Sequence, residues 1–106
     1  MEISHNRILI ALLIGLRGCI TPNIRAVSVD YSEHHISIYF YYQEQPSEME
    51  VELAEEVATE VIAYFPEIAL KSFETNKIVI SYPNRIPDVG FLVFQRYEPT
   101  PEGLNE

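Results

Sequence analysis

Glutamates recur at every fourth position in one stretch of the chain, which makes them the first candidates for chemistry. The row comprises Glu48, Glu52, Glu56 and Glu60, with Glu50 and Glu55 beside it. Residues four apart lie on one face of a helix, so this spacing predicts a column of carboxylates. Like charges so placed destabilise a helix by roughly 0.2–0.5 kcal/mol per pair. Because residues 46–66 contain no lysine or arginine, the column is either a tolerated solvated face or a surface that binds a basic partner.

Catalysis by these carboxylates is not expected. Two carboxyl groups that act as acid and base need unlike environments, whereas these glutamates would share one exposed helix face. The sequence also lacks the GxSxG, P-loop, HExxH and GxGxxG patterns that bring nucleophiles, metals or nucleotides into a site. We therefore expect a protein that is not an enzyme and that binds no cofactor.

The histidines and the single cysteine predict neither a metal site nor a nucleophile. His34 and His35 are adjacent near a strand, where neighbours point to opposite faces, so they would not share a metal ion. His5 and Cys19 lie at opposite ends of one predicted helix, which excludes a Cys–His pair within it. We expect Cys19 to be a small, partly buried side chain. One cysteine also excludes an internal disulfide and favours a reducing, cytoplasmic setting.

The charge of the chain is concentrated in one window. The 106 residues carry 16 acidic and 7 basic side chains, for a net charge of −9. Residues 26–70 contain no lysine or arginine and hold ten of the acids. This balance argues against nucleic acid as a direct partner, because phosphate binding needs basic patches, and it favours a basic protein. The same window holds Tyr31, Tyr39, Tyr41 and Tyr42, and tyrosine is enriched at protein interfaces.

An apolar run at residues 8–14 predicts a buried helix from about Ser4 to Arg17. Ser4 can cap its start and Gly18 can end it. The run is too short to span a bilayer, and Arg17 stands where a signal peptide would have small residues, so we expect neither a membrane span nor an export signal. The expected core stripe is Ile8, Leu9, Leu12, Leu13 and Leu16.

Alternating residues at 24–31 and 35–43, joined by a short polar link at 32–34, predict a β-hairpin. The expected core face consists of Val27, Val29, Ile36, Ile38 and Phe40. The alternation places Arg25 on the same side as Val27. The opposite face, whose polar and aromatic side chains suit solvent or a partner, would consist of Ser28, Asp30, Ser37, Tyr39 and Tyr41.

A second helix is predicted within residues 46–66, where Ser47 and Glu50 form a capping box and Pro66 ends the helix. Its expected buried stripe is Met49, Leu53, Val57, Val61 and Tyr64, with Ala54, Ala58 and Ile62 beside it. The cap and the helix dipole explain acids in the first turn, such as Glu48 and Glu50. The acids beyond that turn need another explanation, and they are Glu52, Glu55, Glu56 and Glu60.

The last third of the chain predicts two or three strands. Residues 67–83 form either two short strands, at Ile68–Leu70 and Ile78–Ile80, joined by a turn at Thr75-Asn76, which we favour, or one long bent strand. A loop follows at 82–90, then a strand at 91–97 and an acidic tail at 98–106. The order α-β-β-α-β(-β)-β predicts an α+β two-layer sandwich, with two helices on an antiparallel sheet of four to five strands, in a single domain at residues 1–97.

Several short structural motifs along residues 20–97 point to one family. They are Thr21 to Ser28, the strand Ile38 to Tyr42, the helix start Ser47-Glu48, Phe65-Pro66, and Tyr82-Pro83 with Ile86-Pro87 and Gly90. With these motifs the chain resembles the small acidic immunity proteins of bacterial polymorphic-toxin and contact-dependent growth inhibition systems. The resemblance implies a cytoplasmic protein that binds a cognate toxin domain, often a basic nuclease, and blocks its active site. It transfers no binding residue, because the shared motifs are structural.

Two hypotheses of function follow. The first is an immunity protein that neutralises a basic, nuclease-type toxin. Its candidate contacts are Glu48, Glu52, Glu55, Glu56, Glu60, Tyr39 and Tyr41. The alternative is a small oligomeric accessory protein without catalytic activity, whose tyrosine-bearing sheet face packs on a second copy as a homodimer. The sequence leaves open whether the glutamates and the tyrosines share one face.

Overall fold

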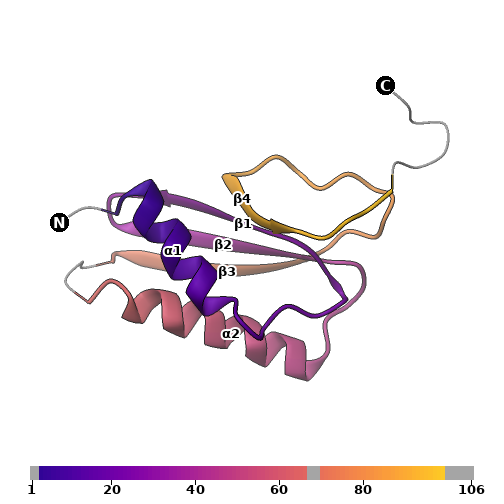
Figure 1. The fold of residues 1–106 in the computed structure, drawn as a ribbon, viewed down its shortest axis with the longest axis horizontal. Coiled ribbons are helices and arrows are strands. Elements are labelled where there is room, and N and C mark those ends of the chain that lie inside the picture. The colour runs from indigo at the N-terminus through magenta and orange to yellow at the C-terminus, as the bar shows by residue number, and fades with distance from the viewer. Residues whose placement is uncertain (1–2, 67–69, 100–106) are drawn as a thin grey trace.

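The computed structural model describes residues 3–66 and 70–99, and in this part of the chain both helices lie on one face of a four-stranded sheet (Figure 1). The elements in chain order are α1 (His5–Gly15), β1 (Ile24–Ser32), β2 (His35–Tyr42), α2 (Glu48–Ala63), β3 (Ser72–Val79) and β4 (Phe91–Gln95). This arrangement confirms the predicted α+β class and the order α-β-β-α-β-β.

The sheet is mixed, and this differs from the fully antiparallel sheet expected from the sequence. Its strand order is β3-β2-β1-β4. β1 pairs antiparallel with both β2 and β4, whereas β2 and β3 pair in parallel. The parallel pair follows from the connection, because α2 carries the chain back along the sheet before β3 begins. A helix between two adjacent strands makes them parallel, whereas a short turn would make them antiparallel.

β3 is one continuous strand, so the favoured prediction of two short strands is wrong. Ser72 to Val79 pair with β2 without a break in register. Thr75 and Asn76, predicted as a turn, lie in the middle of the strand, where the Asn76 side chain donates a hydrogen bond to the Ile38 carbonyl across the ladder. That bond to a neighbouring strand replaces the local bond that would favour a turn. The strand predicted at Ile68 to Leu70 falls mostly outside the described residues.

α1 begins where the sequence predicts, after Ser4, but it ends at Gly15, two residues before the predicted Arg17, and it buries a different face. The Ser4 side chain accepts a hydrogen bond from the Arg7 amide, and Gly18 follows the helix with a φ of 77°. Ile8, Leu12 and Leu16 are buried as expected. Leu13 is 51% exposed and Leu9 only half-buried, whereas Ala11 and Gly15 are buried. The small residues face α2, and at Gly15 an added Cβ would lie 3.4 Å from the Val57 carbonyl oxygen.

α2 also buries mainly small side chains. Its capping box, in which Ser47 and Glu50 bond each other's backbone amides, is confirmed. The buried residues are Ala54, Val57, Ala58 and Val61. Met49 and Ile62 are exposed, contrary to expectation. Val57 also meets Gly15 of α1, which has no side chain, so the two helices approach closely there.

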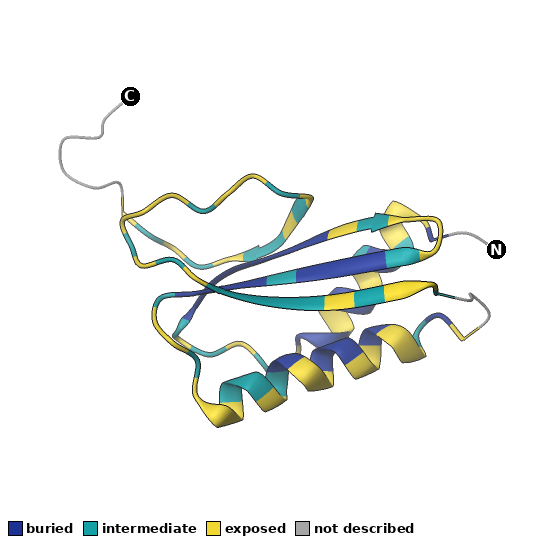
Figure 2. Ribbon diagram, turned by 180° about the vertical axis from the view of Figure 1, so that it is seen from behind, coloured by how far each residue is buried: buried dark blue, intermediate teal, exposed yellow. Residues whose placement is uncertain are grey.

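The hairpin forms the centre of the core, and buried residues run along β1 and β2 (Figure 2). All the predicted core residues of the hairpin are at most 1% exposed, namely Val27, Val29, Ile36, Ile38 and Phe40. Tyr42 joins them against the helices. On the opposite face Asp30 is exposed, but Ser28, Ser37 and Tyr41 are buried. The expectation of a face open to solvent or a partner is therefore wrong for these three residues.

Arg25 departs most clearly from the simple alternation of the hairpin. The register of β1 against β2 shifts between Ile24 and Ala26, so Arg25 does not follow Val27 into the apolar core. Its side chain is nonetheless only 3% exposed. The guanidinium donates to both carboxylate oxygens of Glu98, at 2.6 and 2.8 Å, and to the carbonyls of Ile80 and Asn84. One side chain thereby ties together the segments that flank β4.

Glu98 also binds a second arginine. Arg96 donates to the same carboxylate at 2.9 Å, and further to the Pro22 carbonyl and the Gln43 side chain. Glu98 was expected to begin an acidic tail, but its carboxylate is part of this network. Residues 100–106 of that tail lie outside the described residues.

The Glu98 network should make folding sensitive to acid. The hydrogen bonds from Arg25 hold the pKa of Glu98 below its usual value of 4.5, with Arg96 adding to the effect. The carboxylate therefore stabilises the fold above about pH 4.5, and this contribution is lost as the pH falls through the lower pKa of the folded state. Glu98→Gln should lower the free energy of unfolding by about 1–3 kcal/mol at neutral pH. Urea unfolding from pH 7 to pH 3 should show a flatter pH dependence than for the unaltered chain, and Glu33→Gln in the exposed turn is the control. If the stability of Glu98→Gln and of the unaltered chain fell in parallel as the pH is lowered, Glu98 would not be the group that makes folding sensitive to acid.

Two glycines with positive φ offer a second, internally controlled prediction. Gly18 (φ 77°) has no atom within 4 Å of an added Cβ, whereas at Gly90 (φ 63°) that atom would lie 2.1 Å from the Val29 carbonyl oxygen. Gly18→Ala should cost about 1–2 kcal/mol, the usual strain of a left-handed residue. Gly90→Ala should cost more, about 3 kcal/mol or above, because β1 and the start of β4 must move apart. Thermal unfolding of both variants measures the difference, and equal losses would be inconsistent with this packing.

Candidate functional site

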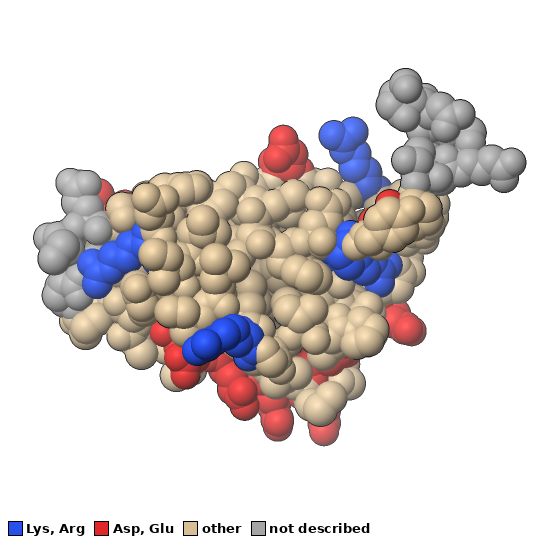
Figure 3. Space-filling model, viewed as in Figure 1, with Lys and Arg blue, Asp and Glu red and all other residues tan. Residues whose placement is uncertain are grey.

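The predicted glutamates project from the solvent side of α2. Glu48, Glu52, Glu55, Glu56 and Glu60 are all exposed. Figure 3 shows carboxylates gathered along the lower edge of the molecule, where α2 lies. Among them Glu55 pairs with Lys77 of β3 at 3.0 Å, but both side chains reach solvent, so the pair adds little stability. We call these five glutamates the acidic surface of α2.

Glu50 belongs to the structure and not to this surface. Its carboxylate accepts hydrogen bonds from the Thr21 hydroxyl, the Asn23 amide and the Ser47 backbone amide. Burial alone would raise the pKa of Glu50, but these donors, Thr21 first among them, outweigh it and hold the pKa below its usual value. Glu50 thus fastens the start of α2 to the loop before β1.

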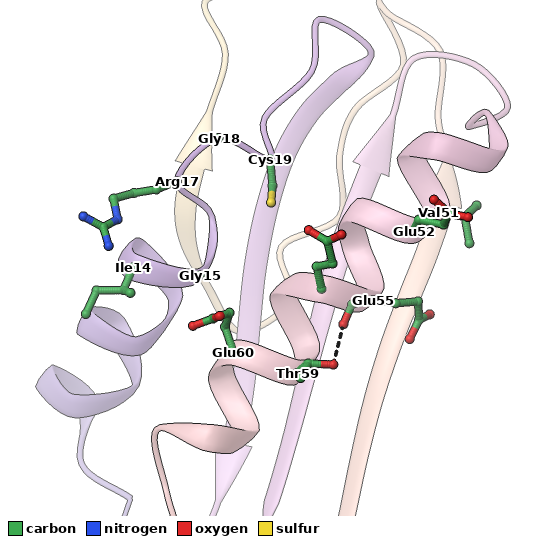
Figure 4. A pocket seen from close by; sticks show the side chains of 11 residues that line it. Ile14, Gly15, Arg17, Gly18, Cys19, Val51, Glu52, Glu55, Thr59 and Glu60 are labelled. Atoms are coloured by element: carbon green, nitrogen blue, oxygen red, sulfur yellow. Dashed lines mark hydrogen bonds between the residues drawn. The ribbon is translucent and has the colours of Figure 1, made fainter.

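A groove lies between the C-terminal end of α1 and the solvent side of α2 (Figure 4). Its volume is about 1030 Å³. The first wall is made by Ile14, Gly15, Arg17, Gly18 and Cys19, and the second by Val51, Glu52, Glu55, Glu56, Thr59 and Glu60. Arg17 stands at the rim and points away from α2 (Figure 4), and no other lysine or arginine of the described chain lines the groove.

The Cys19 sulfur points into this groove (Figure 4), but its surroundings suppress its reactivity. Partial burial raises the pKa of the Cys19 thiol, and the carboxylates of Glu56 and Glu60 raise it further, because a thiolate beside them would be repelled. The nucleophilic form of cysteine is the thiolate. His5, the other half of the Cys–His pair considered from the sequence, packs against the Phe91 ring and not against Cys19. The groove is therefore suited to binding and not to covalent catalysis.

The histidine of β2 sits in a cluster that joins two strands. His35 Nδ1 bonds the Ser72 hydroxyl, and its Nε2 lies 3.1 Å from the Ser37 hydroxyl, which also bonds Glu74. The carboxylate thus contacts the serine and not the imidazole, whereas a catalytic triad needs the reverse order. These bonds tie β2 to β3, and no group of three or more histidine, cysteine or acidic residues in the described chain could hold a metal ion.

The predicted tyrosines lie on the other side of the sheet from the acidic surface of α2. Even-numbered residues of β2 pack in the core under the helices, so Tyr39 and Tyr41 point away from α2. Tyr41 is only 1% exposed, and Tyr39 is half-buried with its ring stacked 6.4 Å from that of Tyr41. The structure therefore separates the candidate residues into two groups. It also leaves little exposed tyrosine on the hairpin for the homodimer considered as the alternative.

An exposed apolar stripe on α1 was missed from the sequence. Ile10, Leu13 and Ile14 are exposed, and so is Ile20 after the helix. Their signal was present, since apolar residues fill more of residues 8–16 than one buried face can hold. Ile14 also lines the groove, so this stripe borders the acidic surface of α2.

Comparison with known proteins gives one family. A family model described as MafI2 immunity protein matches residues 5–98, a span that includes all six helices and strands of the described structure. No curated protein matches the chain. No helix among the described residues is long and apolar enough to cross a bilayer.

The electrostatics of the groove predict how Cys19 reacts. Glu56→Gln together with Glu60→Gln removes the two carboxylates that raise the pKa of the thiol. The pKa should fall, and alkylation by iodoacetamide near neutral pH should become faster. Labelling is followed by mass spectrometry against pH, with the Glu44→Gln, Glu48→Gln double variant as a control of equal charge change. If both double variants reacted at the rate of the unaltered chain, Glu56 and Glu60 would not act on Cys19.

Proposed function

We propose that this chain, which belongs to the MafI2 immunity protein family, binds a cognate toxin domain and neutralises it through the acidic surface of α2. Membership of the family agrees with the resemblance to immunity proteins and implies a toxin as the partner. The observation that carries the choice of surface is the exposure of Glu48, Glu52, Glu55, Glu56 and Glu60 along one side of one helix. Helix capping and the helix dipole explain the glutamates of the first turn only, so the glutamates beyond it need another reason.

The charge of the surface indicates the chemistry of the toxin. Carboxylates in a row attract lysine and arginine, and a chain with net charge −9 associates fastest with a basic protein. Nucleases present such basic surfaces because they must hold phosphates. We therefore infer a nuclease-type toxin. The acidic surface of α2 would cover the cations with which this toxin binds phosphates, and nucleic acid would be displaced. Nucleic acid is then not itself a partner of this chain.

Inhibition by binding needs no chemistry from the immunity protein. The carboxylates of α2 share one exposed environment, and the Cys19 thiol is kept protonated by burial, Glu56 and Glu60. We infer that the chain is not an enzyme and that it acts in the cytoplasm of the cell that must be protected. A single, unreactive cysteine suits that reducing compartment.

Charge reversal on α2 tests this proposal. The variant Glu52→Lys, Glu56→Lys, Glu60→Lys should slow association with the cognate toxin about tenfold or more at low salt, because steering is lost. The association rate of the variant should also depend less on salt. Stopped-flow or surface binding measurements at several salt concentrations give both quantities. Circular dichroism checks that α2 remains folded.

The matched control places the same charge change elsewhere. Glu33→Lys, Glu44→Lys, Asp88→Lys alters three exposed residues outside α2 and changes the net charge equally. At about 0.15 M salt, where charges are screened beyond about 8 Å, it should retain most of the association rate, because steering then depends on where the charges lie. Equal slowing by both triple variants would mean that net charge alone matters, and unchanged binding by the α2 variant would remove α2 from the interface.

A further inference from the structure

The outward face of α1 is apolar, although none of the described residues covers it. Ile10, Leu13 and Ile14 are spaced by three and four residues, so they form one stripe along the helix. Leu13 is 51% exposed. A surface helix normally turns polar residues outward. The stripe thus has the composition of a surface that another molecule buries.

The apolar stripe and the acidic surface of α2 border the same groove. Ile14 lines it from α1, and Glu52, Glu56 and Glu60 line it from α2. Gly15 and Cys19 lie between them (Figure 4). The groove therefore offers an apolar contact at Ile14 on one wall and a row of carboxylates on the other, and a segment bound there must match both walls.

Charge decides among the possible occupants. A second copy of this chain would bring another net charge of −9 and another row of glutamates to the groove, which like-charge repulsion opposes. The chain's own residues 100–106 contain two glutamates and no basic residue, so they are no better matched. The complementary occupant is a separate protein segment that carries aliphatic and basic side chains together.

We propose that the toxin inserts an amphipathic basic helix into the groove between α1 and α2, with its aliphatic face on Ile14 and its lysines or arginines on Glu52, Glu56 and Glu60. This inference rests on the proposed function and names the segment of the toxin that the surface recognises. The glutamates repeat every four residues, about 6 Å along α2, and cations at the same spacing on a neighbouring helix repeat at the same distance. An amphipathic helix laid in an apolar groove is an established mode of peptide recognition.

The apolar wall and the carboxylate wall of the groove should affect different rate constants of toxin binding. Exposed carboxylates speed the encounter of oppositely charged proteins, whereas buried apolar contacts slow their separation. Loss of an aliphatic contact should therefore appear in dissociation and loss of a carboxylate in association. This difference separates the inference from the proposed function, which requires the carboxylates alone.

A matched pair of isoleucines tests the apolar wall of the groove. Ile14 and Ile62 are 39% and 45% exposed, but Ile62 on α2, like Leu92 on β4, does not line the groove. The probe is the cognate toxin domain in a catalytically inactive form. Ile14→Ser should raise the dissociation rate of the complex about tenfold and leave the association rate nearly unchanged, whereas Ile62→Ser should change neither. If Ile14→Ser dissociates no faster than Ile62→Ser, the inference is overturned even if the toxin is still neutralised.

The single cysteine provides an independent measurement of occupancy. Cys19 lies in the groove, so an inserted helix should slow its alkylation by iodoacetamide at about pH 8.5 by tenfold or more. The control is Leu92→Cys in a Cys19→Ser background, whose labelling should not change in the complex. Protection of Cys19 alone supports the inference. Equal labelling of Cys19 with and without bound toxin overturns it and leaves the proposed function standing, whereas failure of the two proteins to associate at all overturns both.

Discussion

A buried guanidinium must be surrounded by acceptors, and Arg25 meets this requirement with groups far apart in the sequence. Its partners are Glu98 and the carbonyls of Ile80 and Asn84, so the segments before and after β4 both converge on the end of β1. β4 completes the sheet beside β1 and lies under α1, which holds the N-terminal helix in place. The fold of the last third of the chain thus depends on one charged side chain that the alternation of β1 alone would have placed in the apolar core.

Local features of the fold could be predicted from the sequence because they depend on neighbours in the chain. The cap at Ser4, the capping box at Ser47 and the hairpin core all follow from short-range patterns. The parallel partner of β2 could not be predicted in this way, since Thr75 and Asn76 carry turn signals that pairing with a distant strand overrides. The burial of Arg25 depended in the same way on Glu98, which stands 73 residues later.

The candidate site was predicted only in part, because short-range patterns place residues within one element but not relative to other elements. Periodicity places the glutamates on one side of α2, and the structure exposes them there. Periodicity cannot place Tyr39 and Tyr41 relative to that helix, because tertiary packing decides which side of the sheet α2 covers. The same limit hid the groove, whose two walls come from α1 and α2 and meet because Gly15 lets α1 approach Val57 and Glu60 of α2 closely.

The residues of α2 that pack in the interior and the charged residues that face solvent are two separate sets. Alanines and valines hold it to the sheet, and charged residues face outward. Substitutions on the outward side leave the packed interior unchanged, so they carry little penalty for folding. If the acidic surface of α2 binds the toxin as proposed, related chains can change the partner that they bind while they keep the same core.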